Sequence, residues 1–297
     1  MEYRGRFAPS PTGDLHFGSL VAALAGWLRA RQRGGIWLIR VEDIDPPREV
    51  EGSAQAILAA LDRFGLHSVT PPLYQSRRSD AYAAALQRLK HESHAFACWC
   101  SRSDLDAAGK LHRDGSCLAP RRPDRAPAWR LRVPDAEIVF DDGLQGGQRQ
   151  NVREAVGDFV LIRADGLWSY QLACVVDDAF QGITEVVRGC DLLDSTPRQI
   201  LLQRLLGLPT PAYLHLPLAL DAEGRKLSKS TDAPRADTDD PCATLARALR
   251  FLGQPAPDAG DPVAMLRIAA DKLDLARLHG IHSAKPGPAF AESRAKG

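Results

Sequence analysis

The sequence predicts an α/β protein whose core is a parallel sheet with helices on both faces, and three observations support this. A short apolar strand ends near Ala8, a helix follows, and the strand 36–41 is nearly continuously apolar, which together make a βαβ unit. The segments 184–189 and 215–220 are further apolar strands separated by a helix. Ser10, Glu42, Arg188 and Lys226 follow strand ends, where open parallel sheets bind ligands.

Composition describes an ordinary globular chain. It has 297 residues, of which 44% are hydrophobic, and no apolar run reaches the roughly 18–20 residues of a membrane span. The first residues enter structure without the apolar stretch of a secretion signal, so we expect a cytoplasmic protein with no membrane association. The net charge is +1, so any nucleic-acid surface must be local.

The stretch between Pro9 and Ser19 is irregular, because two prolines and Gly13 interrupt it. A helix then runs from about Ser19 to the arginines before Gly34. A strand, a tight loop and a helix N-terminus form a site for an anion, and His16 lies in that loop. Taken alone, such a loop is more often an ordinary βα turn with a surface histidine, and the distant stretch Lys226–Ser230 argues against that interpretation.

The remaining elements follow from periodicity and turn residues. Helices are predicted at 49–64, 79–93, 167–178, 197–206, 242–252 and 262–273, and strands at 129–133, 137–143 and 158–166. We divide the chain into a first catalytic half (1–95), an insertion (96–157), a second catalytic half (158–231) and a small helical region with a frayed tail (232–297).

The insertion contains a candidate metal site. Cys98 and Cys100 are followed by Cys117, and His112 precedes it, which supplies up to four ligands for one structural Zn²⁺. The polar stretch 101–127 has too few apolar residues for a core of its own, so a metal would stabilise it. Three unpaired thiols are the alternative.

Two stretches resemble the signatures of class I aminoacyl-tRNA synthetases: His16-Phe17-Gly18-Ser19 and Lys226-Leu227-Ser228-Lys229-Ser230. The resemblance implies a Rossmann-like catalytic domain in which a carboxylate attacks the α-phosphorus of ATP, with His16 and Lys229 as catalytic residues. Ser19 replaces the usual second histidine, so His16 supplies the only imidazole of the motif. The ATP-binding residues that the resemblance implies, with Mg²⁺ accompanying the nucleotide, are Ser10, Thr12, Gly13, His16, Gly18, Ser19, Lys226, Ser228 and Lys229.

The stretch Arg6–Gly13 resembles the opening of glutamyl-tRNA synthetases more closely. Arginine matches a carboxylate in bidentate geometry, and Glu42 corresponds to the residue that binds the substrate ammonium group. The glutamate-binding residues that this resemblance implies are Arg6, Phe7, Ala8, Pro9, Ser10, Glu42, Tyr170, Arg188 and Asp191.

Within that group the chain is similar to glutamyl-Q tRNA(Asp) synthetases over about residues 3–275. The sequence ends before the large helical anticodon-binding region of ordinary glutamyl-tRNA synthetases, and Ser19, the stretch 39–48 and the Cys-x-Cys insertion agree with the shorter family. The resemblance implies that the protein uses glutamate, ATP and queuosine-containing tRNA(Asp), and we expect it to be a monomer. That family commonly uses a tyrosine as its fourth zinc ligand; Arg113 stands there, and we expect the adjacent His112 to replace it.

Three alternatives stay open from the sequence. A truncated glutamyl-tRNA synthetase would charge a tRNA 3′ end, and a non-catalytic regulator would bind the nucleotide without activating an amino acid. A generic nucleotidyltransferase would share the histidine and lysine motifs without needing Arg6, Glu42, Tyr170 and Arg188. The basic segments 29–33 and 121–125 could contact RNA, but a solvated surface explains them equally well.

Overall fold

The computed structural model describes residues 2–107, 111–220, 224, 236 and 238–285. It confirms the opening βαβ unit: β1 (Arg4–Phe7) lies parallel to β2 (Ile36–Val41), and α1 (Phe17–Gln32) connects them. Leu20, Leu24 and Leu28 recur at helical spacing in α1 and are fully buried. Gly34, at a φ of 62°, follows the helix in a conformation that favours glycine.

The centre of the molecule is formed by two sheets that adjoin through β1 and β9 (Glu185–Gly189). β3 (Leu73–Tyr74) extends the first sheet in parallel from β2. The second sheet has the order β7-β6-β10-β9, with β6 (Glu137–Asp142), β7 (Gly146–Asn151) and β10 (Ala212–Leu216). The backbone N–H of Thr184 donates to the carbonyl of Arg4 at 2.9 Å, which places β9 beside β1. The parallel strands therefore direct several carboxyl ends toward one region.

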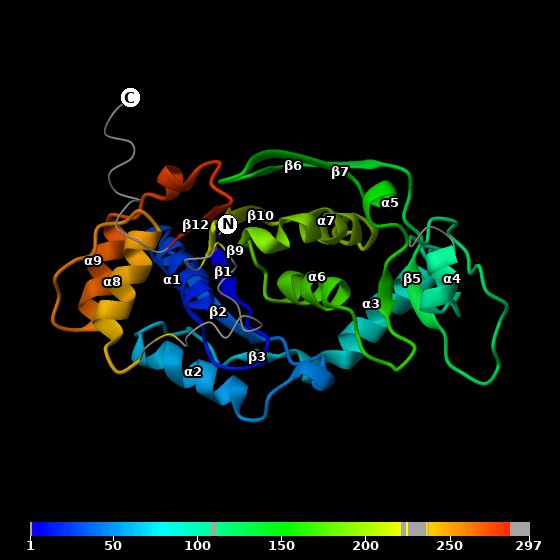
Figure 1. Ribbon diagram of the computed structural model, residues 1–297, viewed down its shortest axis with the longest axis horizontal. Helices are drawn as coiled ribbons and strands as arrows, with labels where there is room; N and C mark the ends of the chain where they lie inside the picture. The colour runs from blue at the N-terminus through cyan, green and yellow to red at the C-terminus, as the bar shows by residue number, and fades with distance from the viewer. Residues whose placement is uncertain (1, 108–110, 221–223, 225–235, 237, 286–297) are drawn as a thin grey trace.

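Two hydrophobic cores pack against these sheets, and Figure 1 shows the helices that contribute to them. One surrounds α1 and includes α2 (Ser53–Arg63), α8 (Pro241–Phe251) and α9 (Pro262–Asp271). The other lies among α3 (Ser79–His91), α6 (Tyr170–Phe180) and α7 (Thr196–Leu205). The amphipathic helices predicted at 242–252 and 262–273 are confirmed as α8 and α9, which pack against α1.

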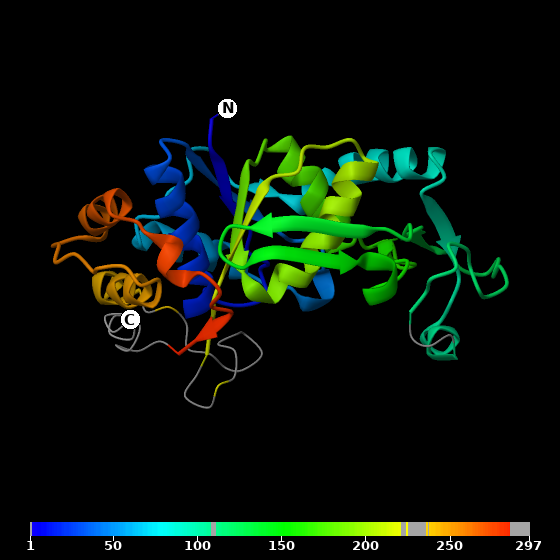
Figure 2. The same ribbon diagram turned by 90° about the horizontal axis from the view of Figure 1, so that it is seen from above.

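The segment 96–157, predicted as an insertion, contributes strands to two sheets. β4 (Ala95–Cys98), β5 (Ala128–Leu131) and β8 (Val160–Ile162) form an antiparallel sheet next to α4 (Arg102–Ala107). Figure 2 shows α4 and β5 at one end of the elongated molecule, with α8 and α9 at the other. The segment 96–157 also contains β6, which pairs in parallel with β10 of the catalytic sheet. The same segment continues through β7 and ends with the short helix α5 (Val152–Ala155).

Two strands differ from the sequence prediction. The apolar strand expected at 215–220 is divided at Pro217, because proline cannot donate to a strand ladder, into β10 and β11 (Leu218–Ala219). β11 pairs instead with β12 (Ser283–Ala284). β7 was not predicted, since its sequence Gly-Gly-Gln-Arg-Gln-Asn has no apolar alternation; it is stabilised by its pairing with β6.

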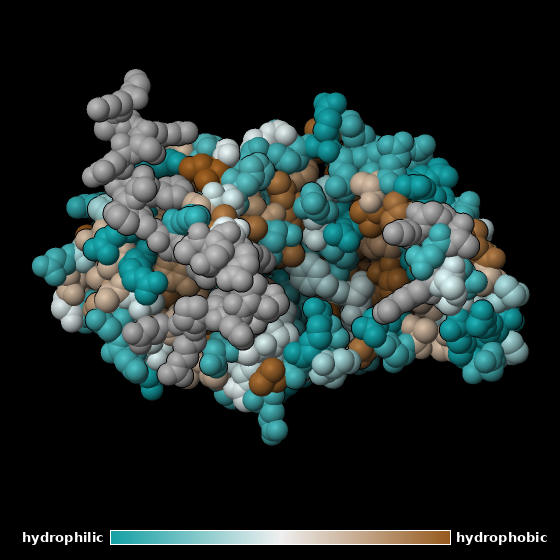
Figure 3. Space-filling model, viewed as in Figure 1, coloured by the Kyte–Doolittle hydropathy of each residue, from teal (hydrophilic) through white to brown (hydrophobic). Residues whose placement is uncertain are grey.

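The face of the molecule shown in Figure 3 is mainly polar where its residues are described. On the face shown in Figure 3, hydrophobic residues form small separate patches among hydrophilic ones. Among the described residues, no helix combines the length and the apolar character that crossing a membrane would require.

Candidate active site

A cavity of about 790 Å³ lies at the carboxyl ends of β1, β2 and β9. Its lining includes every residue predicted to bind glutamate: Arg6, Phe7, Ala8, Pro9, Ser10, Glu42, Tyr170, Arg188 and Asp191. Among the predicted ATP-binding residues, Ser10, Thr12, His16, Gly18 and Ser19 also line it. Lys226, Ser228 and Lys229 lie outside the described residues. Residues from three distant parts of the chain therefore meet at one site.

Gly13 does not line the cavity but shapes the loop beside it. Its backbone N–H donates to Oγ of Ser53 at 3.0 Å, and the hydroxyl of Ser53 donates to the carbonyl of Gly13 at 2.7 Å. Its φ of 133° lies in the region that favours glycine. Ser53 is buried at the start of α2, so this pair of bonds anchors the loop to that helix. Gly13 therefore fixes the loop geometry, and its expected contact with ATP stays a prediction.

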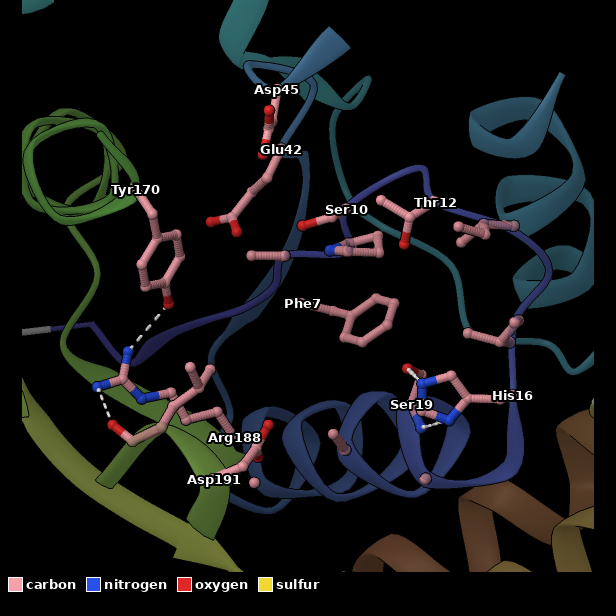
Figure 4. A pocket seen from close by; sticks show the side chains of 18 of the residues that line it. Phe7, Ser10, Thr12, His16, Ser19, Glu42, Asp45, Tyr170, Arg188 and Asp191 are labelled. Atoms are coloured by element: carbon pink, nitrogen blue, oxygen red, sulfur yellow. Dashed lines mark hydrogen bonds between the residues drawn. The ribbon is translucent and has the colours of Figure 1, made fainter. Parts of the chain in front are cut away.

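His16 is the N-cap of α1 and is bonded to Ser19 (Figure 4). Its Nδ1 accepts from the backbone N–H of Ser19 at 3.2 Å, and its Nε2 lies 2.8 Å from Oγ of Ser19. Since Nδ1 accepts, the ring proton belongs on Nε2, which donates to the hydroxyl oxygen. The hydroxyl hydrogen of Ser19 can then donate to a ligand at the helix N-terminus, where the helix dipole favours an anion.

Arg6 is buried in a network of two guanidinium groups and two carboxylates. Its Nε lies 3.1 Å from Oδ1 of Asp178 on α6, and Nη1 of Arg40 lies 2.6 Å from the same oxygen. Nη2 of Arg40 reaches Oε1 of Glu42 at 3.3 Å. The sulfur of Cys174 lies 3.4 Å from Nη2 of Arg40, inside this group. The charges compensate one another within the network, which satisfies the requirement for burying ions.

The two carboxyl groups respond differently to this environment. Burial opposes ionisation of Asp178, but the guanidinium groups of Arg40 and Arg6 outweigh it and hold the pKa of Asp178 well below its usual range. Burial raises the pKa of Glu42, and the attraction of Arg40 and Arg6 offsets this only in part. Glu42 lines the cavity, so a cationic ligand would restore its preference for the charged form.

Arg188, on β9, is held by uncharged groups and faces the same cavity. Its Nε donates to Nε2 of His215 at 3.0 Å, and Nη1 donates to the hydroxyl of Tyr170 at 3.3 Å. Nη2 donates to Oγ1 of Thr196 at 2.9 Å and to the carbonyl of Leu192 at 3.3 Å. Arg188 is only 5% exposed, so its positive charge is largely removed from water. Such a cation attracts a carboxylate, which can accept from Nη1 and from the Tyr170 hydroxyl.

The cavity has two chemically different ends. In Figure 4, Tyr170 and Arg188 point toward each other at one end, His16 and Ser19 lie at the other, and Glu42 and Ser10 lie between them. The first end suits an anionic side chain and Glu42 suits an ammonium group. The second end is a helix N-terminus suited to phosphate.

The sequence reasoning did not select several lining residues on the rim. Ile44, Asp45, Arg163 and Trp168 all line the cavity. The indole N–H of Trp168 donates to Oγ of Ser79 at 3.3 Å, and its ring packs edge-on against Tyr82, which fixes its position. The position of Trp168 two residues before Tyr170 could have identified it as a lining residue. The sequence pattern predicted a helix over both residues, and Trp168 was not considered as part of the site.

Cys98, Cys100 and Cys117 form the metal-compatible group that the sequence predicted. Their sulfurs lie within 4.8 Å of one another, and Sγ of Cys100 is 3.8 Å from Sγ of Cys117. Two thiolates on a tetrahedral zinc, each about 2.3 Å from the metal, would be separated by about 3.8 Å. The backbone N–H of Trp99 donates to Cys117 at 3.1 Å and Nε of Arg130 donates to Cys98 at 3.3 Å, and both would stabilise thiolates. The three residues therefore fit a metal ion.

The assignment of His112 as the fourth ligand is corrected. His112 is not in the cysteine group; it is buried with its Nδ1 2.9 Å from Oδ2 of Asp158, and its ring packs against Phe96. Its adjacency to Arg113 suggested a ligand, whereas the fold uses it to join the insertion to the start of β8. The side chain of Arg113 donates to the carbonyls of Arg153 and Glu154. Among the described residues, no other His, Cys, Asp or Glu joins the cysteine group.

Comparisons with known proteins agree with this geometry. The family model described as the catalytic domain of class I tRNA synthetases (E and Q) matches residues 2–271. A glutamyl-Q tRNA(Asp) synthetase from Xanthomonas axonopodis pv. citri is 59% identical over 253 residues, covering 85% of this chain and 83% of that protein. One from Burkholderia cenocepacia is 56% identical over 272 residues, covering 88% and 91%.

A solved structure shows the same architecture. The glutamate tRNA ligase from Elizabethkingia meningosepticum, crystallised in complex with its amino acid, superposes with a TM-score of 0.81 at 26% identity. The match covers 98% of this chain and 68% of that protein. The chain therefore belongs to the glutamyl-Q tRNA(Asp) synthetases, which have the catalytic domain of class I tRNA synthetases.

Proposed function

We propose that the protein activates glutamate with ATP, without needing tRNA, and then transfers glutamate to the queuosine base at the wobble position of tRNA(Asp). The observation that carries the proposal is the cavity with an arginine–tyrosine pair at one end, a buried glutamate in the middle and a capped helix N-terminus at the other. The side-chain carboxylate of glutamate matches the first of these groups and its ammonium group matches the second, while the helix N-terminus suits the phosphates of ATP. The acceptor of the glutamyl group, queuosine in tRNA(Asp), is inferred from the names of the relatives.

The residues divide these tasks by position. Arg188 and Tyr170 bind the side-chain carboxylate, because their end of the cavity is opposite His16 and Ser19. Glu42 binds the ammonium group, which directs the α-carboxylate toward the nucleotide. Arg6, which keeps its ion pair with Asp178, stabilises the negative charge of the bound amino acid. Binding in this orientation converts the encounter of two reactants into an intramolecular step.

In the first step, an oxygen of the α-carboxylate bonds to the α-phosphorus of ATP and pyrophosphate leaves, accompanied by Mg²⁺. Negative charge accumulates on the phosphate oxygens, so donors at the helix N-terminus accelerate the reaction. Ser19 donates its hydroxyl hydrogen while His16 orients it, and the resemblance to class I synthetases assigns phosphate contacts to Lys226, Ser228 and Lys229 as well. In the second step, a hydroxyl of queuosine attacks the glutamyl carbonyl, an ester forms and AMP leaves with loss of the hydroxyl proton.

Two measurements test this function. Glutamate-dependent exchange of labelled pyrophosphate into ATP is expected without any RNA; no exchange would favour a non-catalytic regulator. Transfer of labelled glutamate is then measured to tRNA(Asp) with and without queuosine, each both intact and with its 3′-terminal adenosine removed. Labelling of the queuosine-containing tRNA alone is expected. Labelling that requires the terminal adenosine and ignores queuosine would instead identify a truncated glutamyl-tRNA synthetase.

We also propose that Cys98, Cys100 and Cys117 hold one structural zinc ion, since their sulfur spacing suits it. The metal would connect β4 to the segment before β5 in a region with few buried apolar residues. Metal analysis of the purified protein is expected to find one zinc per chain, and Cys117→Ser should lose it. A folded protein without zinc would contradict this assignment. A monomeric state, a cytoplasmic location and the domain boundaries stay predictions of the sequence.

A further inference from the structure

Arg188 is connected to two residues that do not line the cavity. Its Nε donates to Nε2 of His215, and Nδ1 of His215 lies 2.6 Å from Oδ2 of Asp142. The three residues lie on adjacent strands: Arg188 on β9, His215 on β10 and Asp142 at the end of β6 (Figure 1). Neither Asp142 nor His215 is among the cavity-lining residues, so both reach a ligand only through Arg188.

The hydrogen bonds specify one protonation state. The Nε of an arginine is always a donor, so Nε2 of His215 must accept, and the imidazole must be neutral with its proton on Nδ1. That proton is donated to the carboxylate of Asp142. Burial lowers the pKa of His215 despite its hydrogen bond to Asp142, and the charge of Arg188 acts in the same direction as burial. A protonated His215 would present a second cation and a competing N–H to Arg188.

Asp142 is itself locked in orientation. Its Oδ1 accepts from the backbone N–H groups of Leu144, Gln145 and His215 at 3.0, 2.9 and 3.2 Å. Only Oδ2 is directed at the imidazole of His215. An asparagine here would keep its oxygen toward the three backbone donors, so its NH₂ group would face Nδ1. The imidazole proton would then move to Nε2 and point at the N–H of Arg188.

We propose that Asp142 and His215 are positioning residues that hold Arg188 for the side-chain carboxylate of the amino acid and thereby set selectivity for glutamate over glutamine. This inference rests on the role proposed above for Arg188 in glutamate binding. With Nε tied to His215 and Nη2 tied to Thr196 and Leu192, the guanidinium presents Nη1 beside the Tyr170 hydroxyl. Nη1 of Arg188 and the Tyr170 hydroxyl can both donate to a ligand there, which suits the two oxygens of the glutamate carboxylate. The carboxamide of glutamine would place its NH₂ group, itself a donor, against one of these donors.

A second buried histidine–aspartate pair provides a matched control. His112 and Asp158 are fully buried, with Nδ1 2.9 Å from Oδ2, and Asp158 also accepts from the backbone N–H groups of Val133 and Gly115 at 2.8 Å. Neither residue lines the cavity. Asp158→Asn therefore disturbs the same kind of pair without affecting an arginine of the site.

The experiment measures glutamate-dependent pyrophosphate exchange by Asp142→Asn, His215→Asn, His215→Gln, Arg188→Lys and Asp158→Asn. Asp142→Asn and His215→Asn should raise the KM for glutamate about tenfold, the effect of one hydrogen bond to a charged group, with the KM for ATP nearly unchanged. The ratio of exchange with glutamate to exchange with glutamine should fall in parallel. His215→Gln places a carbonyl oxygen near the position of Nε2 and should recover most of the affinity.

The outcomes separate the inference from the proposed function. If Arg188→Lys leaves the KM for glutamate unchanged, the proposed binding role itself fails. If Arg188→Lys raises it, but Asp142→Asn and His215→Asn change it no more than Asp158→Asn does, only the positioning role is overturned. Equal losses in His215→Gln and His215→Asn would also overturn it. Should Asp142→Asn not fold, the two His215 variants carry the same test.

Discussion

Arg6 and Arg188 both line the cavity from the ends of parallel strands, but Arg6 has a carboxylate partner whereas Arg188 is held by uncharged groups. Arg6 shares the carboxylate of Asp178 with Arg40, and Glu42 completes a group of two cations and two anions. Arg188 makes all four of its hydrogen bonds to described residues with uncharged groups. Removing the carboxylate partner of a buried cation destabilises the fold, whereas a buried cation among neutral acceptors gains most from an anionic ligand.

This difference predicts that each region responds to a different measurement. Loss of Asp178, the carboxylate that Arg6 and Arg40 share, should appear mainly in protein stability, because it leaves buried charges uncompensated. Substitutions around Arg188 should appear mainly in substrate binding, because the neutral partners tolerate its loss better. Four predictions test this contrast, from the largest expected effect to the smallest.

Asp178→Asn should destabilise the protein most. The substitution leaves Arg6 and Arg40 without their shared anion, and breaking a buried ion pair in this way costs about 3–5 kcal/mol. Urea unfolding followed by circular dichroism measures the change. A loss below about 1 kcal/mol would show that the network is not the stabilising feature inferred here.

Arg188→Lys should lower kcat/KM for glutamate about 100-fold, since lysine cannot donate through Nε, Nη1 and Nη2 at once. Its unfolding free energy should change less than that of Asp178→Asn. Pyrophosphate exchange and urea unfolding on the same preparations provide both values. Equal destabilisation of the two variants would abolish the contrast between the arginines.

Glu42 should impose a pH dependence on glutamate binding. Burial raises its pKa, so as the pH falls Glu42 gains a proton, and loses its attraction for the ammonium group, at a higher pH than an exposed glutamate would. Exchange activity measured from pH 5 to pH 8 should decline on the acidic side. Glu42→Gln should lower kcat/KM by about tenfold at neutral pH and remove that decline. If the wild-type protein and Glu42→Gln show the same decline in activity at acidic pH, the decline arises from a group other than Glu42.

Ser19→Ala should have the smallest effect. It removes one neutral hydroxyl donor at the helix N-terminus, worth about 0.5–1.5 kcal/mol, so the KM for ATP should rise about threefold to tenfold. The KM for glutamate should stay constant, because Ser19 lies at the opposite end of the cavity from Arg188. A parallel increase in both constants would indicate that the loop has moved as a whole.

Much of the site was predictable because its residues lie in recognisable local contexts. Arg6 and Ser10 flank a strand end, Glu42 follows a buried strand, and His16 precedes a helix. Parallel strands bring their carboxyl ends together, so the convergence follows once the strands are identified. Cys98, Cys100 and Cys117 were likewise correctly grouped from their spacing.

His112 shows where local reasoning fails. Its position between Cys100 and Cys117 suggested a ligand, yet its partner is Asp158, 46 residues further along the chain. Likewise, β7 forms without an apolar pattern because its backbone pairs with that of β6 in an antiparallel arrangement. In both cases the stabilising partner is distant in sequence.

The sequence by itself determined the βαβ opening, the strand ends that carry the site and the glutamate-type motifs, since hydrophobic periodicity and turn residues encode them locally. Tertiary structure alone decided how the charges are distributed. Arg188 lies 27 residues from His215 in the sequence, and His215 lies 73 residues from Asp142. Arg6 and Asp178 are 172 residues apart. Periodicity specifies which side chains are buried, whereas strand order decides which buried polar groups form contacts, and those contacts determine whether an arginine of the site is paired with a carboxylate or with neutral groups.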